Sequence, residues 1–179
     1  MLPRIDADLA AQVRETGCPH CGGRLDVADY PRAPRGVAGL DASWDTRLSF
    51  CCAAEGCRRR ATPPSVRFLG RKVYVGAVVV LATALQHGPT ATSVTALSKL
   101  LGITRRTLVR WRRWWSMMFG ASRFWESLRG RFVPAVDAAA LPASALARMT
   151  AGDDADHLVA LLHIIAPVTT RPGLEASAM

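Results

Sequence analysis

The sequence predicts a mainly α-helical protein that carries a small β-sheet module near its N-terminus. Two cysteine pairs, each beside a short strand candidate, lie within residues 18–57. Segments with apolar residues at helical spacing, bounded by hydroxyl residues, glycines or prolines, follow over residues 65–131 and again over 132–179. These observations divide the chain into three parts: 1–64, 65–131 and 132–179.

The composition suits a folded protein whose middle part is strongly basic. Charged residues make up 21% of the 179 residues and apolar residues 50%, and the length allows one domain or two small modules. The net charge of +9 is unevenly distributed, with −2 over residues 1–57, +14 over 58–131 and −3 over 132–179. The middle of the chain therefore predicts a polyanionic partner.

Neither a secretory signal nor a membrane span is expected. The first 17 residues are polar and amphipathic, without an apolar core. The longest apolar run, Val73–Leu85, has 13 residues, whereas a span needs about 20. We therefore expect a cytoplasmic protein with no membrane partner.

The N-terminal part predicts one helix and two strands around a loop. We expect a short helix over Asp8–Glu15 and strands over Arg24–Tyr30 and Thr46–Cys52. Prolines and glycines predict a loop over Tyr30–Asp45. The proline pair at residues 63–64 then breaks the backbone and predicts a module boundary there.

The middle part predicts four helices. Gly70–His87 is apolar on nearly all sides, which favours a buried central helix, although the β-branched run Val78–Val80 leaves a strand open. Further helices are expected from Thr92 or Ser93 to Leu101, over Arg105–Met118 with Thr104 as its cap, and over Arg123–Arg129.

The C-terminal part predicts two short helices and a frayed tail. The helices are expected over Pro142–Met149 and Asp154–Ile165, and the second carries an apolar stripe that must pack on something. Pro167 is expected to stop that helix, and the tail begins at Thr169.

The cysteines predict a structural zinc site. Cys18-Pro-His-Cys21-Gly-Gly is a tight turn that aims two thiolates at one metal, and Cys52-Ala-Ala-Glu-Gly-Cys57 supplies a second pair about 30 residues later. Four thiolates suit one tetrahedral Zn²⁺ and leave no open position for catalysis. We therefore expect a zinc ribbon with Cys18, Cys21, Cys52 and Cys57 as ligands.

Two alternatives stay open at this site. Cys51 can replace Cys52, because only one of two adjacent strand residues points to the same side, and the glycine before Cys57 favours Cys52. His20 lies inside the first turn and is interpreted as a spacer rather than a ligand.

Residues 92–115 follow the pattern of a helix-turn-helix. An apolar-faced helix, the Leu-Gly-Ile turn at 101–103 and a hydroxyl-capped basic helix occur in that order. Leu97 and Leu101 are expected to pack against Ile103, Leu108 and Trp111. The fold class is therefore mainly α with a small β zinc ribbon, a helix-turn-helix bundle and a short C-terminal helical segment.

The basic helix of this pattern has one apolar and one arginine-rich side. Leu108, Trp111 and Trp115 define the buried side, and Trp114 and Trp115 are interpreted as packing residues rather than base-stacking platforms. Arg106, Arg110 and Arg113 fall on the opposite side, where arginine reads guanine in the major groove of double-stranded DNA. Thr104 and Arg105 at the helix start are expected near the phosphates or the first base. The remaining candidates are expected to contact phosphates, which position the protein without specifying sequence: Arg112, Arg58, Arg59 and Arg60.

A four-cysteine turn pair followed by a helix-turn-helix resembles the N-terminal DNA-recognition part of bacterial insertion-sequence transposases, over about residues 16–116. The resemblance implies binding to the ends of a mobile element, in a protein associated with the bacterial nucleoid. Such transposases carry a ribonuclease-H-like catalytic domain with three carboxylates, and residues 132–179 are too few for that fold.

Three functions are therefore weighed. The first is a non-catalytic, sequence-specific DNA-binding protein of a mobile element, working with a transposase or recombinase in trans. The second is a zinc-containing transcriptional regulator, which homodimerisation on a palindrome would favour. The third is a reduced metal-dependent enzyme that uses Asp153 and Asp154, although helix capping accounts for these acids.

Overall fold

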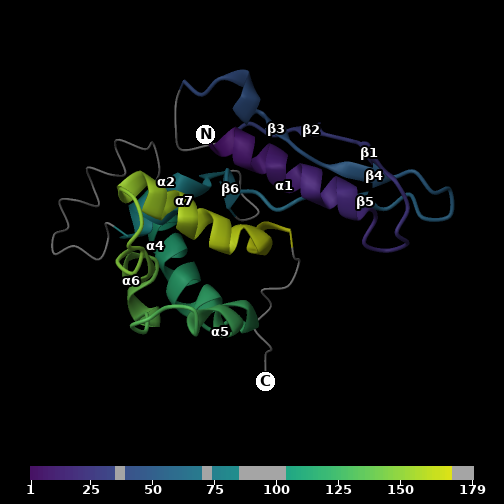
Figure 1. Ribbon diagram of the computed structural model, residues 1–179. Coiled ribbons are helices and arrows are strands. Elements are labelled where there is room, and N and C mark those ends of the chain that lie inside the picture. Colours follow the sequence, from purple (N-terminus) through teal and green to yellow (C-terminus); the bar gives the residue numbers. More distant parts are fainter. Residues whose placement is uncertain (35–38, 70–73, 85–103, 171–179) are drawn as a thin grey trace.

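The computed structural model describes residues 1–34, 39–69, 74–84 and 104–170, and about half of these residues are helical (Figure 1). The N-terminal elements are α1 (Leu2–Thr16), β1 (Leu25–Val27), β2 (Tyr30–Pro31), the 3-10 helix η1 (Ala42–Trp44), β3 (Thr46–Arg47), β4 (Phe50–Cys52) and β5 (Arg60–Ala61). They are followed by β6 (Phe68–Leu69), β7 (Tyr74–Val75), α2 (Gly76–Ala84), α4 (Arg105–Arg113), the π-helix η3 (Trp114–Phe119), α5 (Arg123–Arg129), the 3-10 helix η4 (Ala138–Ala140), α6 (Ala143–Leu146), α7 (Asp154–Ile165) and the 3-10 helix η5 (Ala166–Thr169).

The cysteine-bearing part is built on a three-stranded antiparallel sheet in the order β1-β4-β5. In its register Leu25 pairs with Cys52, and Phe50 pairs with Ala61. The side chains of Leu25, Phe50 and Ala61 form a small core with Ala10 of α1, and Val13 packs against it. Helix α1 therefore covers one side of this sheet.

Each of the two predicted strands is in fact two shorter strands. β1 lies within the first predicted strand and β2 begins at its last residue, Tyr30, and extends to Pro31, in the predicted loop; β3 and β4 lie within the second predicted strand. Between β1 and β2, and between β3 and β4, the backbone pairing is interrupted. There the N–H of Ser49 donates to the carboxylate of Asp29 at 2.8 Å instead of to a backbone carbonyl of the neighbouring strand. β2 and β3 consequently pair as a separate two-stranded sheet.

Helix α1 is longer than predicted and takes part in two cores. It begins at Leu2, well before the predicted start at Asp8, with a proline in its first turn, where no intrahelical N–H bond is lost. Ile5 and Leu9 pack against a larger helical core, whereas Ala10 belongs to the core of the cysteine sheet. The helix joins the two clusters.

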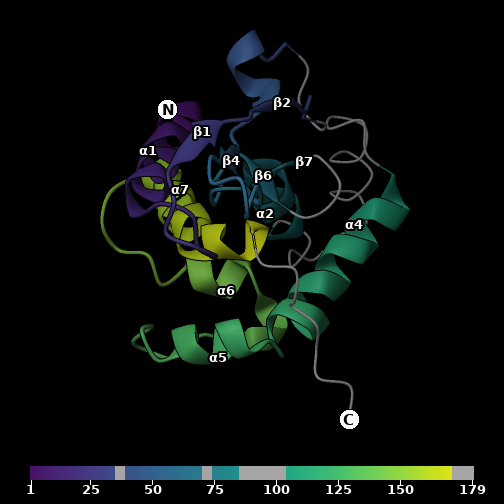
Figure 2. The ribbon, with the colours of Figure 1, turned by 90° about the vertical axis from the view of Figure 1, so that its right-hand side faces the viewer.

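The larger core is formed by α2, α4, η3, α5 and α7, seen from a second side in Figure 2. Val80, Leu108 and Trp115 are fully buried in it. The central helix predicted from Gly70 begins at Gly76, because β6 and β7 pair as a hairpin ahead of it. The valine run Val78–Val80 is helical, not a strand.

The later helices follow local sequence signals. α5 and α7 have the predicted bounds; the side chain of Ser122 caps α5, and Asp153 and Asp156 cap α7 reciprocally. α6 is shorter than predicted, and η5 continues the chain past Pro167. The predicted helix ending at Leu101, the turn at 102–103, the contacts of Leu97 and Leu101, and residues 171–179 lie outside the described residues.

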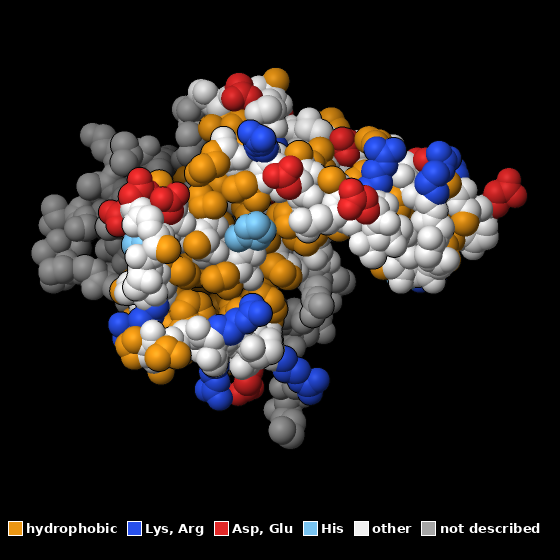
Figure 3. Space-filling model, in the orientation of Figure 1, with side chains coloured by type: hydrophobic (Ala, Val, Ile, Leu, Met, Phe, Trp, Pro, Cys, Tyr) orange, Lys and Arg blue, Asp and Glu red, His pale blue; other side chains and the backbone are white. Residues whose placement is uncertain are grey.

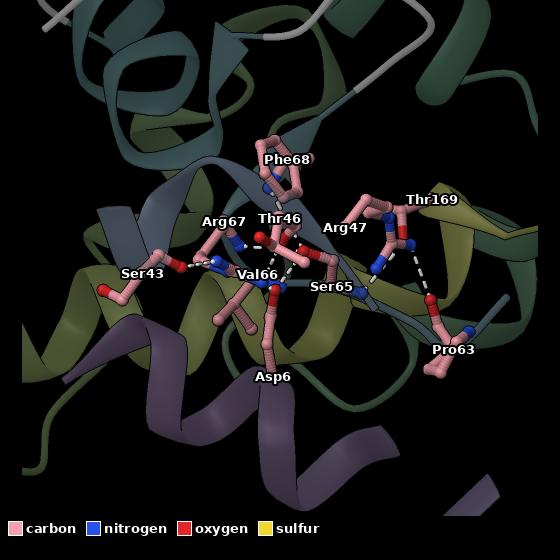
Figure 4. Close-up of polar contacts among 10 residues, drawn as sticks. All are labelled: Asp6, Ser43, Thr46, Arg47, Pro63, Ser65, Val66, Arg67, Phe68 and Thr169. Carbon is pink, nitrogen blue, oxygen red and sulfur yellow. Dashed lines mark hydrogen bonds and ion pairs between the residues drawn. The ribbon is translucent and has the colours of Figure 1, made fainter. Parts of the chain in front are cut away.

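A buried polar cluster ties α1 to the segment that follows the proline pair (Figure 4). The carboxylate of Asp6 accepts hydrogen bonds from the hydroxyl of Ser65, the N–H of Val66 and the guanidinium of Arg67. Arg67 also donates to the backbone carbonyls of Ser43 and Thr46. One side chain of α1 therefore fixes η1, β3 and residues 65–67 relative to one another.

Candidate metal centre and basic helix

Four cysteines converge at the end of the sheet that lies beside the C-terminal end of α1. The Sγ atoms of Cys18, Cys21, Cys52 and Cys57 all lie within 4.8 Å of one another. Sγ of Cys18 is 3.7 Å from that of Cys57, and Sγ of Cys21 is 3.4 Å from that of Cys52. A tetrahedral site with Zn–S bonds near 2.3 Å has S–S edges of about 3.8 Å, so the four thiols fit a metal ion.

The two cysteine turns have related backbone geometry. The N–H of Gly22 donates to the carbonyl of Cys18 at 2.8 Å, and the N–H of Arg58 donates to that of Ala54 at 3.1 Å. Both donors, each directly after the second cysteine of its pair, have positive φ, +72° for Gly22 and +47° for Arg58. A positive φ is favourable for glycine, as at Gly22. At Arg58 the same left-handed conformation is adopted by a residue with a Cβ atom, which makes it less favourable.

Backbone N–H groups point at the thiols and set their acidity. The N–H of His20 lowers the pKa of Cys18 from 9.0 to about 7, assisted by the N–H of Cys21 and opposed by burial. The N–H of Ala54 acts on Cys52 in the same direction, but burial and the neighbouring thiols raise the pKa of Cys52 to about 12. N–H donors of this kind stabilise metal-bound thiolates.

The alternatives at this centre differ in position. Cys51 is outside the group, because its Sγ lies 3.4 Å from the backbone carbonyl of Arg58 and Cys52 points the other way, as adjacent strand residues do. His20 is exposed, and its Nδ1 lies 3.1 Å from the guanidinium of Arg59. This contact links the two cysteine turns.

The three consecutive arginines after Cys57 have different surroundings. Arg60 donates to the carbonyl of Ala28 and to the hydroxyl of Ser49, both at 2.8 Å, and its guanidinium lies over the ring of Tyr30. All three arginines are exposed, and Arg59 contacts His20. Arg60 differs from the other two because its guanidinium is bound to the sheet, which it stabilises.

Helix α4 places its apolar and basic residues on opposite sides. Oγ1 of Thr104 accepts the N–H of Thr107 and caps the helix. Leu108, Trp111 and Trp115 face the larger core. All five arginines of the helix are exposed, and none forms an ion pair with another residue in the described ranges: Arg105, Arg106, Arg110, Arg112 and Arg113.

The tryptophans that follow α4 are packing residues. Trp115 is fully buried, and its ring centroid lies 4.9 Å from those of Trp114 and Phe119. Trp114 is half-buried against the same core. Trp115 therefore offers no free face on which a base could stack.

A shallow groove of about 370 Å³ runs along the exposed side of α4 and η3. Its lining combines cationic and apolar side chains and reaches the edge of the buried side at Leu108: Arg105, Leu108, Val109, Arg112, Arg113, Ser116 and Met117. Val109 and Met117 are each 57% exposed. Neither residue is among the site residues predicted from the sequence, although the position of Val109 between the arginines of α4 could have indicated it.

The acidic residues of the C-terminal part act as helix caps. The carboxylate of Asp153 accepts the N–H groups of Ala155 and Asp156, and Asp156 accepts the N–H of Asp153 in return. Figure 3 shows acidic side chains gathered at this end of α7 and apolar side chains over the helices beside it. Among the described residues, the cysteine cluster is the one group of three or more metal-ligating side chains placed to hold an ion.

No family model, curated protein or solved structure matches this chain. Within the described residues, none of the helices combines the length and the apolar character that crossing a membrane requires.

Proposed function

We propose that this chain is a non-catalytic protein that binds double-stranded DNA sequence-specifically through the exposed side of α4. The observation that carries the proposal is the set of five exposed arginines on nine consecutive residues, unpaired with any acid in the described ranges. Solvated helix faces commonly mix both signs of charge, whereas α4 carries one. The major groove is about 12 Å wide and admits one helix.

The arginines have separate roles in this proposal. Arg106, Arg110 and Arg113 contact base edges, preferably guanine O6 and N7, because the planar guanidinium matches both acceptors. Thr104 and Arg105 at the helix start, Arg112 and the exposed pair Arg58 and Arg59 contact phosphates, which position the protein without reading sequence. Arg60 contributes less to DNA binding, because its donors are engaged within the sheet.

The metal in this proposal is a single structural zinc ion. The Sγ separations and the N–H groups aimed at the thiols support a closed four-thiolate site, for which zinc is the usual occupant. The small core of this part supports the assignment, because few apolar side chains hold it together without a metal.

The biological setting rests on the resemblance to transposase recognition modules. We place the protein in a mobile genetic element, as an accessory factor or as the recognition subunit of a transposase or recombinase that acts in trans. A transcriptional regulator is the alternative, since it needs the same zinc site and the same helix.

One experiment separates these readings. The zinc-loaded full chain is used to select fragments from a genomic DNA pool at near-physiological salt, and the bound fragments are sequenced. Enrichment of one motif at element ends supports the mobile-element role, and enrichment of palindromes in promoters supports the regulator. Recovery of unselected DNA, lost steeply as salt rises, overturns sequence-specific binding and leaves backbone attraction alone.

A further inference from the structure

One apolar residue lies among the arginines on the exposed side of α4. Val109 is 57% exposed although α4 has a fully buried side available for apolar residues. At 100° per residue, Arg105, Arg106, Arg112 and Arg113 all lie within about 60° of Val109 around the helix axis, two on each side. Isolated exposed valines are common on protein surfaces. This one lies in the groove of about 370 Å³ that arginines border.

From this arrangement, we propose that Val109 contacts the C5-methyl group of a thymine in the major groove, beside guanines contacted by Arg106 and Arg113. The inference rests on the proposed DNA-binding function and adds one base to it. Thymine is the base that presents a methyl group in this groove, and an apolar side chain is its usual contact. A valine between cationic neighbours thus favours a site in which thymine lies next to guanine.

The position of Val109 suits DNA better than RNA. The five arginines of α4 are spread over an arc of about 160° around the helix axis, and Val109 lies within about 20° of the middle of that arc. A helix seated in the groove through these arginines therefore brings Val109 close to the base edges. The major groove of A-form RNA is too deep and narrow to be read by side chains, and uracil lacks the methyl group. An acidic helix of a partner protein could also pair with these arginines. Binding to such a partner would not depend on a thymine methyl group, so the test below distinguishes it from DNA.

The test removes that methyl group without changing base pairing. The motif obtained by selection is prepared with each thymine replaced in turn by deoxyuridine, and affinities are measured by fluorescence anisotropy for the full zinc-loaded chain. We expect one position at which deoxyuridine weakens binding about three- to tenfold, as the loss of one buried methyl contact implies. Val109→Ala should bind the thymine site that much more weakly and should no longer distinguish thymine from deoxyuridine there.

A matched control and three outcomes make the test decisive. Val133→Ala changes a valine that is 88% exposed and lies outside α4, and it should retain the full response to deoxyuridine. Specific binding that no deoxyuridine weakens overturns the inference and leaves the proposed function standing. A response that survives in Val109→Ala overturns it as well, because another group then contacts the methyl. Absence of any DNA preference overturns both proposals. The deoxyuridine series on the unaltered protein remains valid if Val109→Ala fails to fold.

Discussion

Asp6 and Arg67 form an ion pair in the interior of the molecule, with 2.7 Å between Oδ2 of the aspartate and Nε of the arginine. The side chain of Asp6 is fully buried, and that of Arg67 is 2% exposed. Both groups satisfy their remaining hydrogen-bonding capacity with backbone or hydroxyl partners. The pair joins α1 to a residue about sixty positions after Asp6 in the sequence. Each buried charge is compensated by the other.

Replacing Asp6 should therefore destabilise the whole fold. Asp6→Ala leaves the guanidinium of Arg67 buried without a counter-charge, which typically costs about 3–5 kcal/mol. Equilibrium unfolding in urea measures the loss. Asp8→Ala, an exposed acid two residues along the same helix, is the control and should change the free energy of unfolding by less than about 0.5 kcal/mol. Equal effects of the two substitutions would show that the buried pair contributes nothing special.

Gly76 is expected to tolerate no side chain. A Cβ atom there would lie 2.8 Å from the carbonyl oxygen of Val66 and 3.1 Å from Cδ2 of Leu162. The Leu162 side chain can shift, but the backbone carbonyl cannot, so Gly76→Ala forces the start of α2 away from the backbone at Val66. Overpacking of this kind costs about 1–3 kcal/mol. Gly130→Ala is the matched control, because nothing lies within 4 Å of its Cβ position. Thermal denaturation of both variants should show a clear loss for Gly76→Ala alone.

The metal centre is tested by removing one thiol at a time. Cys21→Ser and Cys57→Ser each leave three thiolates, so bound zinc should fall from one equivalent per chain to a small fraction, and the β1-β4-β5 sheet should lose its order. Cys51→Ser should keep its metal. Metal content is measured after extensive dialysis, and amide exchange reports the order of the sheet. Stoichiometric zinc in the Cys21→Ser and Cys57→Ser proteins would contradict the assigned ligands.

The proposed division between base and phosphate contacts is tested with two arginines. Arg110→Ala should weaken binding to the selected motif by about 1–3 kcal/mol and relax the preference at one base position. Arg59→Ala should weaken binding to all sequences alike and reduce the slope of the salt dependence by about one. Arg129→Ala, which removes an exposed arginine paired with Glu126, is the control. Identical losses on specific and random DNA would remove Arg110 from base reading.

The features that the sequence predicted well are those with local signals. α7 has its predicted bounds because Asp153 and Asp156 cap it within one turn, and Ser122 does the same for α5. The cysteine group follows from spacing, since each pair lies on one tight turn. Thr104 caps α4 for the same reason, through its contact with Thr107.

The features that the sequence could not predict depend on partners far along the chain. Nothing near Asp6 indicates that its counter-charge is Arg67, and the sequence predicts a helix only from Asp8, whereas α1 begins at Leu2. The hairpin of β6 and β7 could not be predicted, because β7 lies in a continuous apolar run. Such a run shows neither the alternation of a strand nor the spacing of an amphipathic helix, so its pattern does not distinguish a strand from a buried helix. The sequence predicts one helix over Arg105–Met118, whereas the geometry changes from α- to π-helical after Arg113, in the segment where the rings of Trp115 and Phe119 pack against one another.

Helix α1 belongs to both cores, and this has a consequence for the order in which a ribosome releases the chain. Ala10 can pack as soon as β5 has emerged, which completes the cysteine sheet. Asp6 must wait for Ser65–Arg67, and the apolar residues at the start of α1 must wait for the helical core, whose last helix ends at Ile165. During synthesis the first part of α1 therefore remains exposed to solvent after its second part has packed. The carboxylate of Asp6 is then hydrated, whereas in the folded protein it is buried.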